Sequence, residues 1–276
     1  MNALEIRGLT KRRGDFALQG LDLTLPAGCI MGLIGENGAG KSTTIRLILN
    51  ALSRDGGTVA VYGKDNRALT PLEREDIGAV LDEVGLPEYM TARQIGRMMA
   101  GIFARWQPEV YRGYLRRLAL PEDKPFRDFS RGMKMKLGLA AALSHQPKLL
   151  LLDEATSGLD PVVRDEILTI FADFTRDEEH AVLISSHIVS DLEKICDYIA
   201  FLHKGRLLLC EEKDRLTEEY GILRGTTEGI EPAAVCGQRA TPYGTEYLLR
   251  RSAVPAGVPL GQVNIEDLFV FMAKEA

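Results

Sequence analysis

A continuous apolar run followed by a glycine-rich loop constrains the fold of this chain more than any other feature. CIMGLI, residues 29–34, has the length and unbroken apolar character of a strand in a parallel sheet. GENGAGKST, residues 35–43, satisfies G-x-x-x-x-G-K-[ST], and residues 43–52 then have helical periodicity. This order predicts a phosphate-binding loop, because glycines let the backbone wrap an anion and the amides that begin the helix point at it. The alternative is a glycine-rich turn that only begins a helix.

The residues of this loop predict binding of a nucleoside triphosphate with Mg²⁺. Lys41 would reach the β- and γ-phosphates, and the Ser42 hydroxyl would be a ligand of Mg²⁺. The residues that we expect to contact the nucleotide are Gly35, Glu36, Asn37, Gly38, Ala39, Gly40, Lys41, Ser42 and Thr43.

Two acidic residues end a second apolar strand. In LLLLDE, residues 149–154, Asp153 and Glu154 stand just past the carboxyl end of the strand, the edge at which open α/β sheets bind ligands. Asp153 can hold Mg²⁺ through water, and Glu154 can orient or deprotonate an attacking water. Two acids after a strand are, by themselves, more often a solvated turn. The phosphate-binding loop in the same chain favours the catalytic interpretation, and the two motifs together predict a P-loop nucleotidase.

The remaining pattern predicts an α/β protein. Strands alternate with helices, which is typical of a mostly parallel sheet. Residues 3–9 and 16–25 predict an antiparallel edge, and residues from about 90 to 145 predict an all-helical subdomain. The composition changes near residue 214, where Gly, Thr and Pro rise. We therefore expect a P-loop NTPase core in residues 1–213 and a small C-terminal extension in residues 214–276.

Local signals predict where helices and turns begin. Asp160 followed by Pro161 suits an N-cap and first turn, and Ser190 with Glu193 suits a capping box. The stretch YIAFLHKGRLLLC predicts a hairpin that turns at Lys204 and Gly205.

The composition argues against several classes of protein. A net charge of −5 disfavours nucleic acid as a partner, because neutralising phosphates needs surplus Lys and Arg. Cys29, Cys196, Cys210 and Cys236 form no CxxC pair, which predicts free thiols in a reducing compartment. The N-terminus lacks the apolar core of a signal peptide, and no apolar run approaches the ~20 residues that span a bilayer. If the protein works at a membrane, we expect another chain to supply the spanning part.

Three further motifs resemble the ATP-binding cassette (ABC) family. FSRGM, residues 129–133, resembles its LSGGQ signature, SGLD at 157–160 resembles its D-loop, and His187 resembles its switch histidine. The resemblance runs in order from about residue 3 to 212. It implies ATP and Mg²⁺ as cofactors and a head-to-tail pair of nucleotide-binding subunits. In such a pair, each site combines the phosphate-binding loop of one subunit with the signature of the other.

The resemblance also implies a set of site residues. The Ser130 hydroxyl, the Gly132 amide and the dipole of the helix that they begin would face the γ-phosphate held by the second subunit. Asp160 of the D-loop belongs to the same expected surface. The expected catalytic residues are Glu154, His187 and Lys41.

The sequence departs from the family pattern in and around the site. Arg13 stands where an adenine-stacking aromatic is expected, and either Arg13 or nearby Phe16 could stack on the base. Asp82 stands at the position of the Q-loop glutamine. A carboxylate is a hard ligand, so we expect Asp82 to serve Mg²⁺, the alternative being that it only caps the loop after a strand. Further departures are Arg131, Met133 and Ala155. Because the serine, glycine, lysine and both carboxylates remain, an active ATPase is expected.

The leading functional interpretation is the ATP-hydrolysing subunit of a membrane ABC transporter. We expect it to be peripheral at the cytoplasmic face of the cell membrane, with a separate membrane-spanning permease and a second, identical or different, nucleotide-binding subunit as partners. MKMKL, SSHIVSDLEK and IEDLFVFM resemble a bacterial subgroup that pairs with export-type permeases for peptides or antibiotics. The alternative is a soluble ABC ATPase of translation or DNA repair, but those usually carry two cassettes, long coiled coils or zinc cysteines. A catalytically dead binding module is disfavoured by the intact Glu154 and His187.

Some other side chains allow less specific interpretations. Met98, Met99, Phe103 and Trp106 form either a docking groove or, more in keeping with their helical spacing, the core of the helical subdomain. His145, His180 and His203 are expected at the surface.

Overall fold

A six-stranded sheet forms the centre of the molecule. The computed structural model describes residues 1–255 and 257–275, and the order of this sheet is β10-β9-β3-β8-β7-β6. All neighbouring strands are parallel except β9 and β10, which form the expected hairpin. β3, β7 and β8 are buried at every position, because a parallel sheet is covered on both faces. The strands are β3 (Ile30–Ile34), β6 (Ile77–Val80), β7 (Leu149–Asp153), β8 (Ala181–Ser186), β9 (Tyr198–His203) and β10 (Arg206–Glu212).

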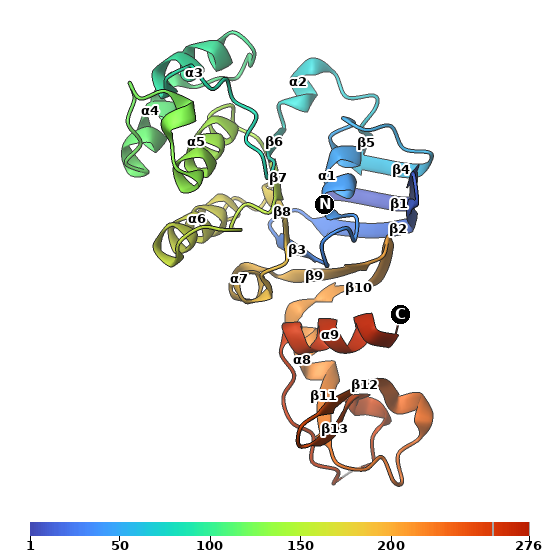
Figure 1. Ribbon diagram of the computed structural model, residues 1–276. Helices are drawn as coiled ribbons and strands as arrows, with labels where there is room; N and C mark the ends of the chain where they lie inside the picture. Colours follow the sequence, from blue (N-terminus) through green and yellow to red (C-terminus); the bar gives the residue numbers. More distant parts are fainter. Residues whose placement is uncertain (256, 276) are drawn as a thin grey trace.

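A four-stranded antiparallel sheet lies beside the central sheet, on the right of Figure 1. Its order is β2-β1-β4-β5, so the antiparallel edge predicted from the sequence is confirmed. One hydrophobic core joins this sheet to β3 and to the helix α1, which follows the glycine-rich loop. The elements are β1 (Asn2–Arg13), β2 (Phe16–Pro26), α1 (Lys41–Ile48), β4 (Gly56–Val61), β5 (Lys64–Asp65) and α2 (Pro71–Arg74).

The helical subdomain projects from the central sheet at the upper left of Figure 1. It consists of α3 (Ala92–Ala100), α4 (Pro108–Arg117), the 3-10 helix η1 (Phe126–Asp128) and α5 (Arg131–Leu143), as the helical spacing predicted. From Leu137 to Leu143 every residue of α5 is buried. α5 therefore packs between the rest of the helical subdomain and β6, and does not lie on the surface of the subdomain.

Helices α6 (Pro161–Phe174) and α7 (Val189–Ile195) follow β7 and β8. The expected Asp160 cap is confirmed, because its Oδ1 accepts from the amides of Val162 and Val163 at 3.1 and 3.0 Å. The capping box expected at Ser190 is wrong, because Ser190 lies inside α7. The N-cap of α7 is instead Ile188, whose amide donates to Ser186 Oγ at 2.9 Å.

The C-terminal extension forms a second small sheet, at the bottom of Figure 1. Its antiparallel order is β11-β13-β12, and α9 packs against β12 and against α7. One hydrophobic cluster contains residues of α9 and residues of the central sheet, so the extension and the central sheet share a hydrophobic interior. The elements are α8 (Lys213–Glu219), β11 (Tyr220–Arg224), η2 (Pro232–Ala234), β12 (Val235–Thr241), β13 (Gly244–Arg250), η3 (Arg251–Ala253) and α9 (Ile265–Glu275).

Two of the three histidines expected at the surface are buried. His145 is 2% exposed and His203 is 5% exposed, so the expectation was wrong for both. The His145 ring stacks on Phe103 at 4.2 Å, and His203 ends β9, a strand that is covered by its neighbours. His180 is half-buried and stacks on Phe174 at 4.4 Å.

Among the residues that the structure describes, no helix combines the length and the apolar character needed to cross a membrane.

Candidate nucleotide-binding site

The glycine-rich loop wraps around the side chain of Lys41. Its ammonium group is buried and donates to the carbonyl oxygens of Gly35 and Glu36 at 2.7 and 3.3 Å. Gly40 has a φ of 113°, and a Cβ there would lie 2.7 Å from Phe16 Cζ. A Cβ on Gly35 would lie 2.4 Å from the carbonyl oxygen of Leu202. Both glycines are therefore required by space, which is what a loop that closes around an anion needs.

The two candidates for stacking on adenine lie at one hairpin, where Arg13 pairs with Phe16 across β1 and β2. The Phe16 ring is half-buried against Gly40 of the loop, whereas Arg13 is exposed. The position of Phe16 against the loop favours it as the aromatic neighbour of a bound base.

The acidic pair stands where β7 ends, as the sequence predicted. Asp153 is 1% exposed and accepts a hydrogen bond from Ser185 Oγ at 2.6 Å. Glu154 has a left-handed backbone with a φ of 53°, and its amide donates to the carbonyl and hydroxyl oxygens of Ser185 at 3.1 Å each. Ser185, from the neighbouring strand β8, thus fixes both acids. Sequence reasoning missed this role, although Ser185 stands only two positions before His187.

The Glu154 carboxylate connects the expected catalytic residues. One oxygen lies 3.1 Å from Lys41 Nζ, and the other accepts from His187 Nδ1 at 2.7 Å. Only 13% of the Glu154 side chain is exposed, compared with 46% of His187. The structure therefore brings Lys41, Glu154 and His187 together, from α1, the end of β7 and the end of β8.

These side chains suit a triphosphate and a magnesium ion. The Lys41 ammonium is a compact cation at the helix start, and Ser42 and Asp153 supply the hard oxygen atoms that Mg²⁺ prefers. Within residues 1–255 and 257–275, no group of three His, Cys, Asp or Glu side chains could hold a metal ion. A site with one carboxylate and one hydroxyl matches Mg²⁺, which is usually bound by few protein ligands together with phosphates and water.

The signature and D-loop residues form a second group. Ser130 is the N-cap of α5, and its Oγ accepts from the Met133 amide at 3.3 Å. A Cβ on Gly132 would lie 3.5 Å from Val163 of α6, so the signature lies against the D-loop helix. Ser130, Gly132 and Asp160 line the same hollow of about 480 Å³. Among the described residues, no hydrogen bond or ion pair joins this group to Lys41 or Glu154.

Asp82 lies in the loop after β6, and its carboxylate has a partner that the sequence did not predict. Oδ1 lies 2.9 Å from the guanidinium of Arg131, the residue that follows Ser130. Each of the two side chains is about half exposed.

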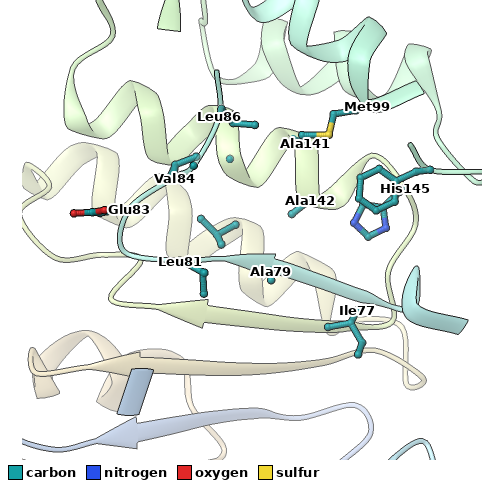
Figure 2. A pocket seen from close by; sticks show the side chains of 14 residues that line it. Ile77, Ala79, Leu81, Glu83, Val84, Leu86, Met99, Ala141, Ala142 and His145 are labelled. Atoms are coloured by element: carbon teal, nitrogen blue, oxygen red, sulfur yellow. The ribbon is translucent and has the colours of Figure 1, made fainter. Parts of the chain in front are cut away.

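An apolar groove of about 300 Å³ lies between β6, its following loop and the helical subdomain (Figure 2). Met99 and Phe103 line it with His145, whereas Trp106 is 9% exposed and packs inside the subdomain against Tyr111. Burial lowers the pKa of His145, although the carbonyl of Glu75, 3.1 Å from Nδ1, acts in the opposite direction. The core interpretation therefore holds for Trp106, whereas a docking role for Met99 and Phe103, which line the groove, stays a prediction.

Three features together define a P-loop nucleotide-binding protein: the buried strand β3, the glycine loop around Lys41, and the two acids at the end of β7. Residues 18–157 match the family model described as "ABC transporter". The chain belongs to this family, and its fold is that of an ATP-hydrolysing cassette.

Individual relatives agree with this assignment. The uncharacterized ABC transporter ATP-binding protein YhcH of Bacillus subtilis (strain 168) is 33% identical over 93% of this chain and 87% of its own. The bacitracin transport ATP-binding protein BcrA of Enterococcus faecalis is 32% identical over 82% of this chain and 73% of its own. A solved ATP-binding subunit of an ABC transporter superposes with a TM-score of 0.71, at 26% identity, over 78% of this chain and 92% of that one.

Proposed function

We propose that this chain hydrolyses ATP to drive export of a peptide or an antibiotic through a separate membrane-spanning permease. The observation that carries the proposal is the position of the Glu154 carboxylate between Lys41 and His187. The bacitracin relative supports the class of cargo. The division into a nucleotide-binding part, residues 1–213, and an extension, residues 214–276, is part of the same proposal.

The residues of one subunit have separable roles. Lys41 and the amides of the loop bind the β- and γ-phosphates, and Phe16 stacks on the base. Glu154 accepts a proton from the attacking water, and His187 holds the carboxylate in place through Nδ1. When ATP binds, Lys41 exchanges the Glu154 carboxylate for a phosphate, which frees the base when the substrate is present.

The second half of the site comes from another nucleotide-binding subunit. Ser130 and Gly132 begin α5, a helix of 13 residues, so the helix dipole and the Gly132 amide suit an anion presented from outside. Within one chain these residues form no hydrogen bond or ion pair with Lys41 among the described residues. This supports a head-to-tail pair, in which Asp160 also faces the partner's nucleotide.

Ser42 and Asp153 would hold Mg²⁺, which when bound neutralises charge on the phosphates. Asp82 remains a predicted third ligand, although reaching a metal would require it to leave Arg131. We expect Asp82→Ala to bind nucleotide normally without metal but to need more Mg²⁺ for hydrolysis, and Asp82→Gln to be milder because an oxygen ligand survives. ATPase rates measured against Mg²⁺ concentration test this, and a wild-type curve for Asp82→Ala would remove Asp82 from the metal site.

The permease partner places the subunit at the cytoplasmic face of the cell membrane. The groove beside Met99 and Phe103 supports this, because it is an apolar hollow at the junction of the core and the helical subdomain. The experiment is co-purification of the tagged chain with a hydrophobic membrane protein from its native membrane, followed by ATPase assay of the complex. Copurification with ribosomes or DNA repair proteins in place of a permease would refute the transport role.

A further inference from the structure

Two departures from the family pattern meet in space. Arg131 replaces a signature glycine and Asp82 replaces a glutamine, 49 positions apart in the chain. Their side chains form an ion pair of 2.9 Å between the loop after β6 and the first residue of α5. The pair thus joins the central sheet to the helical subdomain at the signature itself.

Arg131 also contacts a third motif, the D-loop. A Cβ on Gly158 would lie 3.3 Å from both Cζ and Nη1 of Arg131, so the guanidinium rests against the Gly158 backbone. Gly158 has a φ of 68°, a conformation that glycine adopts without strain. The Arg131 guanidinium therefore touches both the loop after β6 and the loop before α6. In the sequence, Arg131 stands between Ser130 and Gly132.

We propose that Arg131, held by Asp82, is a positioning residue that fixes the start of α5 for contact with the nucleotide of the partner subunit. This rests on the proposed function, because that contact exists only in the head-to-tail pair. An exposed ion pair shifts an equilibrium by no more than about fivefold, so its contribution to overall stability is small. A binding group displaced by about 1 Å, however, loses much of its effect, so the same pair matters where it orients Ser130 and Gly132.

The test is a double-mutant cycle on closure of the dimer, measured without hydrolysis. In the Glu154→Gln background, light scattering gives the ATP concentration at which half of the protein is dimeric. We expect Arg131→Ala and Asp82→Ala each to raise this concentration about threefold, and the double variant also about threefold, because both remove one interaction. Arg127→Ala is the matched control, since Arg127 is an exposed arginine whose side chain lies over the Tyr89 ring and pairs with Asp128 at 3.6 Å rather than with Asp82 or Gly158.

Other outcomes would overturn the proposal. Unchanged single variants would show that the ion pair positions nothing, and a ninefold effect of the double variant would show that the two residues act independently. Failure of the Glu154→Gln parent to dimerise in ATP would refute the proposed head-to-tail pair. In the nucleotide-free protein, shifts of the unfolding midpoint by Arg131→Ala and Asp82→Ala that add up in the double variant would show that the two side chains do not interact.

Discussion

Glu154 combines an unusual backbone with a carboxylate that two partners hold. A non-glycine residue at a φ of 53° costs about 1–3 kcal/mol, and the hydrogen bonds to Ser185 offset part of that cost. The strain orients the side chain so that its two oxygens reach Lys41 and His187. The sequence predicts that Glu154 directly follows a strand. Its left-handed backbone, however, depends on hydrogen bonds to Ser185 of β8, 31 positions further along the chain.

Glu154→Gln is expected to lower the ATPase rate by about 10²–10⁴-fold, because the water loses its base while the phosphate contacts remain. The variant should retain ATP and run as a dimer on a sizing column. It should also bind ATP at least as tightly as the wild type, since the Lys41 ammonium no longer has a carboxylate partner. Turnover at the wild-type rate would show that Glu154 is not the base.

Ser130→Arg is expected to abolish hydrolysis while leaving the ATP affinity of the monomer nearly unchanged. Ser130 Oγ accepts from the Met133 amide, and in the part of the chain that the structure describes no hydrogen bond joins it to Lys41, so the primary site within one chain stays intact. Fluorescence titration with a nucleotide analogue measures the affinity, and Lys41→Ala is the comparison. An equal loss of affinity in the two variants would contradict action across the subunit interface.

At the scale of elements, local patterns predicted most of what the structure contains. The apolar runs gave β3, β7 and β8, and Asp160 marked the start of α6, because these signals act within a few residues. The capping box predicted at Ser190 was wrong, because α7 begins earlier, where the Ser186 hydroxyl accepts a hydrogen bond from the Ile188 amide. The burial of His145 and the pairing of Asp82 with Arg131 depend on which elements meet in space, and no local pattern carries that information.

The helical subdomain offers a matched pair of glycines. In α3, a Cβ on Gly96 would lie 2.5 Å from the Tyr111 ring, which is buried and donates to the Ala92 carbonyl at 2.9 Å. Gly96→Ala should therefore be net destabilising, since overpacking costs about 1–3 kcal/mol and the gain in helix propensity is smaller. Gly113→Ala in α4, where nothing lies within 4 Å, should stabilise by about 0.5–1 kcal/mol. Denaturant unfolding measures both, and equal shifts would contradict the close packing of α3 on α4.

The whole molecule has an extension that sequence composition marks as separate but that shares the interior of the ATPase. Phe269 of α9 meets Phe201 of β9 edge to face at 5.3 Å, and Glu193 of α7 accepts from the Ile265 amide at the start of α9. Because α7 begins just after His187, the extension packs on the element that follows a residue of the proposed catalytic site.

Phe271→Ala is expected to lower the stability of the entire chain by about 3–5 kcal/mol, because Phe271 is fully buried in the shared core. Calorimetry should show one unfolding transition that moves to lower temperature, with loss of ATPase activity at the same midpoint. Tyr243→Ala is the control, since Tyr243 is fully exposed on the same extension. Two separate transitions, only one of which moves, would show that the extension unfolds independently.

Because the interior is shared, ligand binding at the proposed nucleotide site should also change the stability of the extension. A ligand that binds only the folded state stabilises everything that unfolds together with its site, by about 2.7 kcal/mol at a hundredfold excess over Kd. We therefore expect ATP at the proposed site to stabilise β12 and α9 against opening, although neither element supplies a residue to that site. Protease resistance of the C-terminal segment should then rise with the fraction of the protein that holds nucleotide.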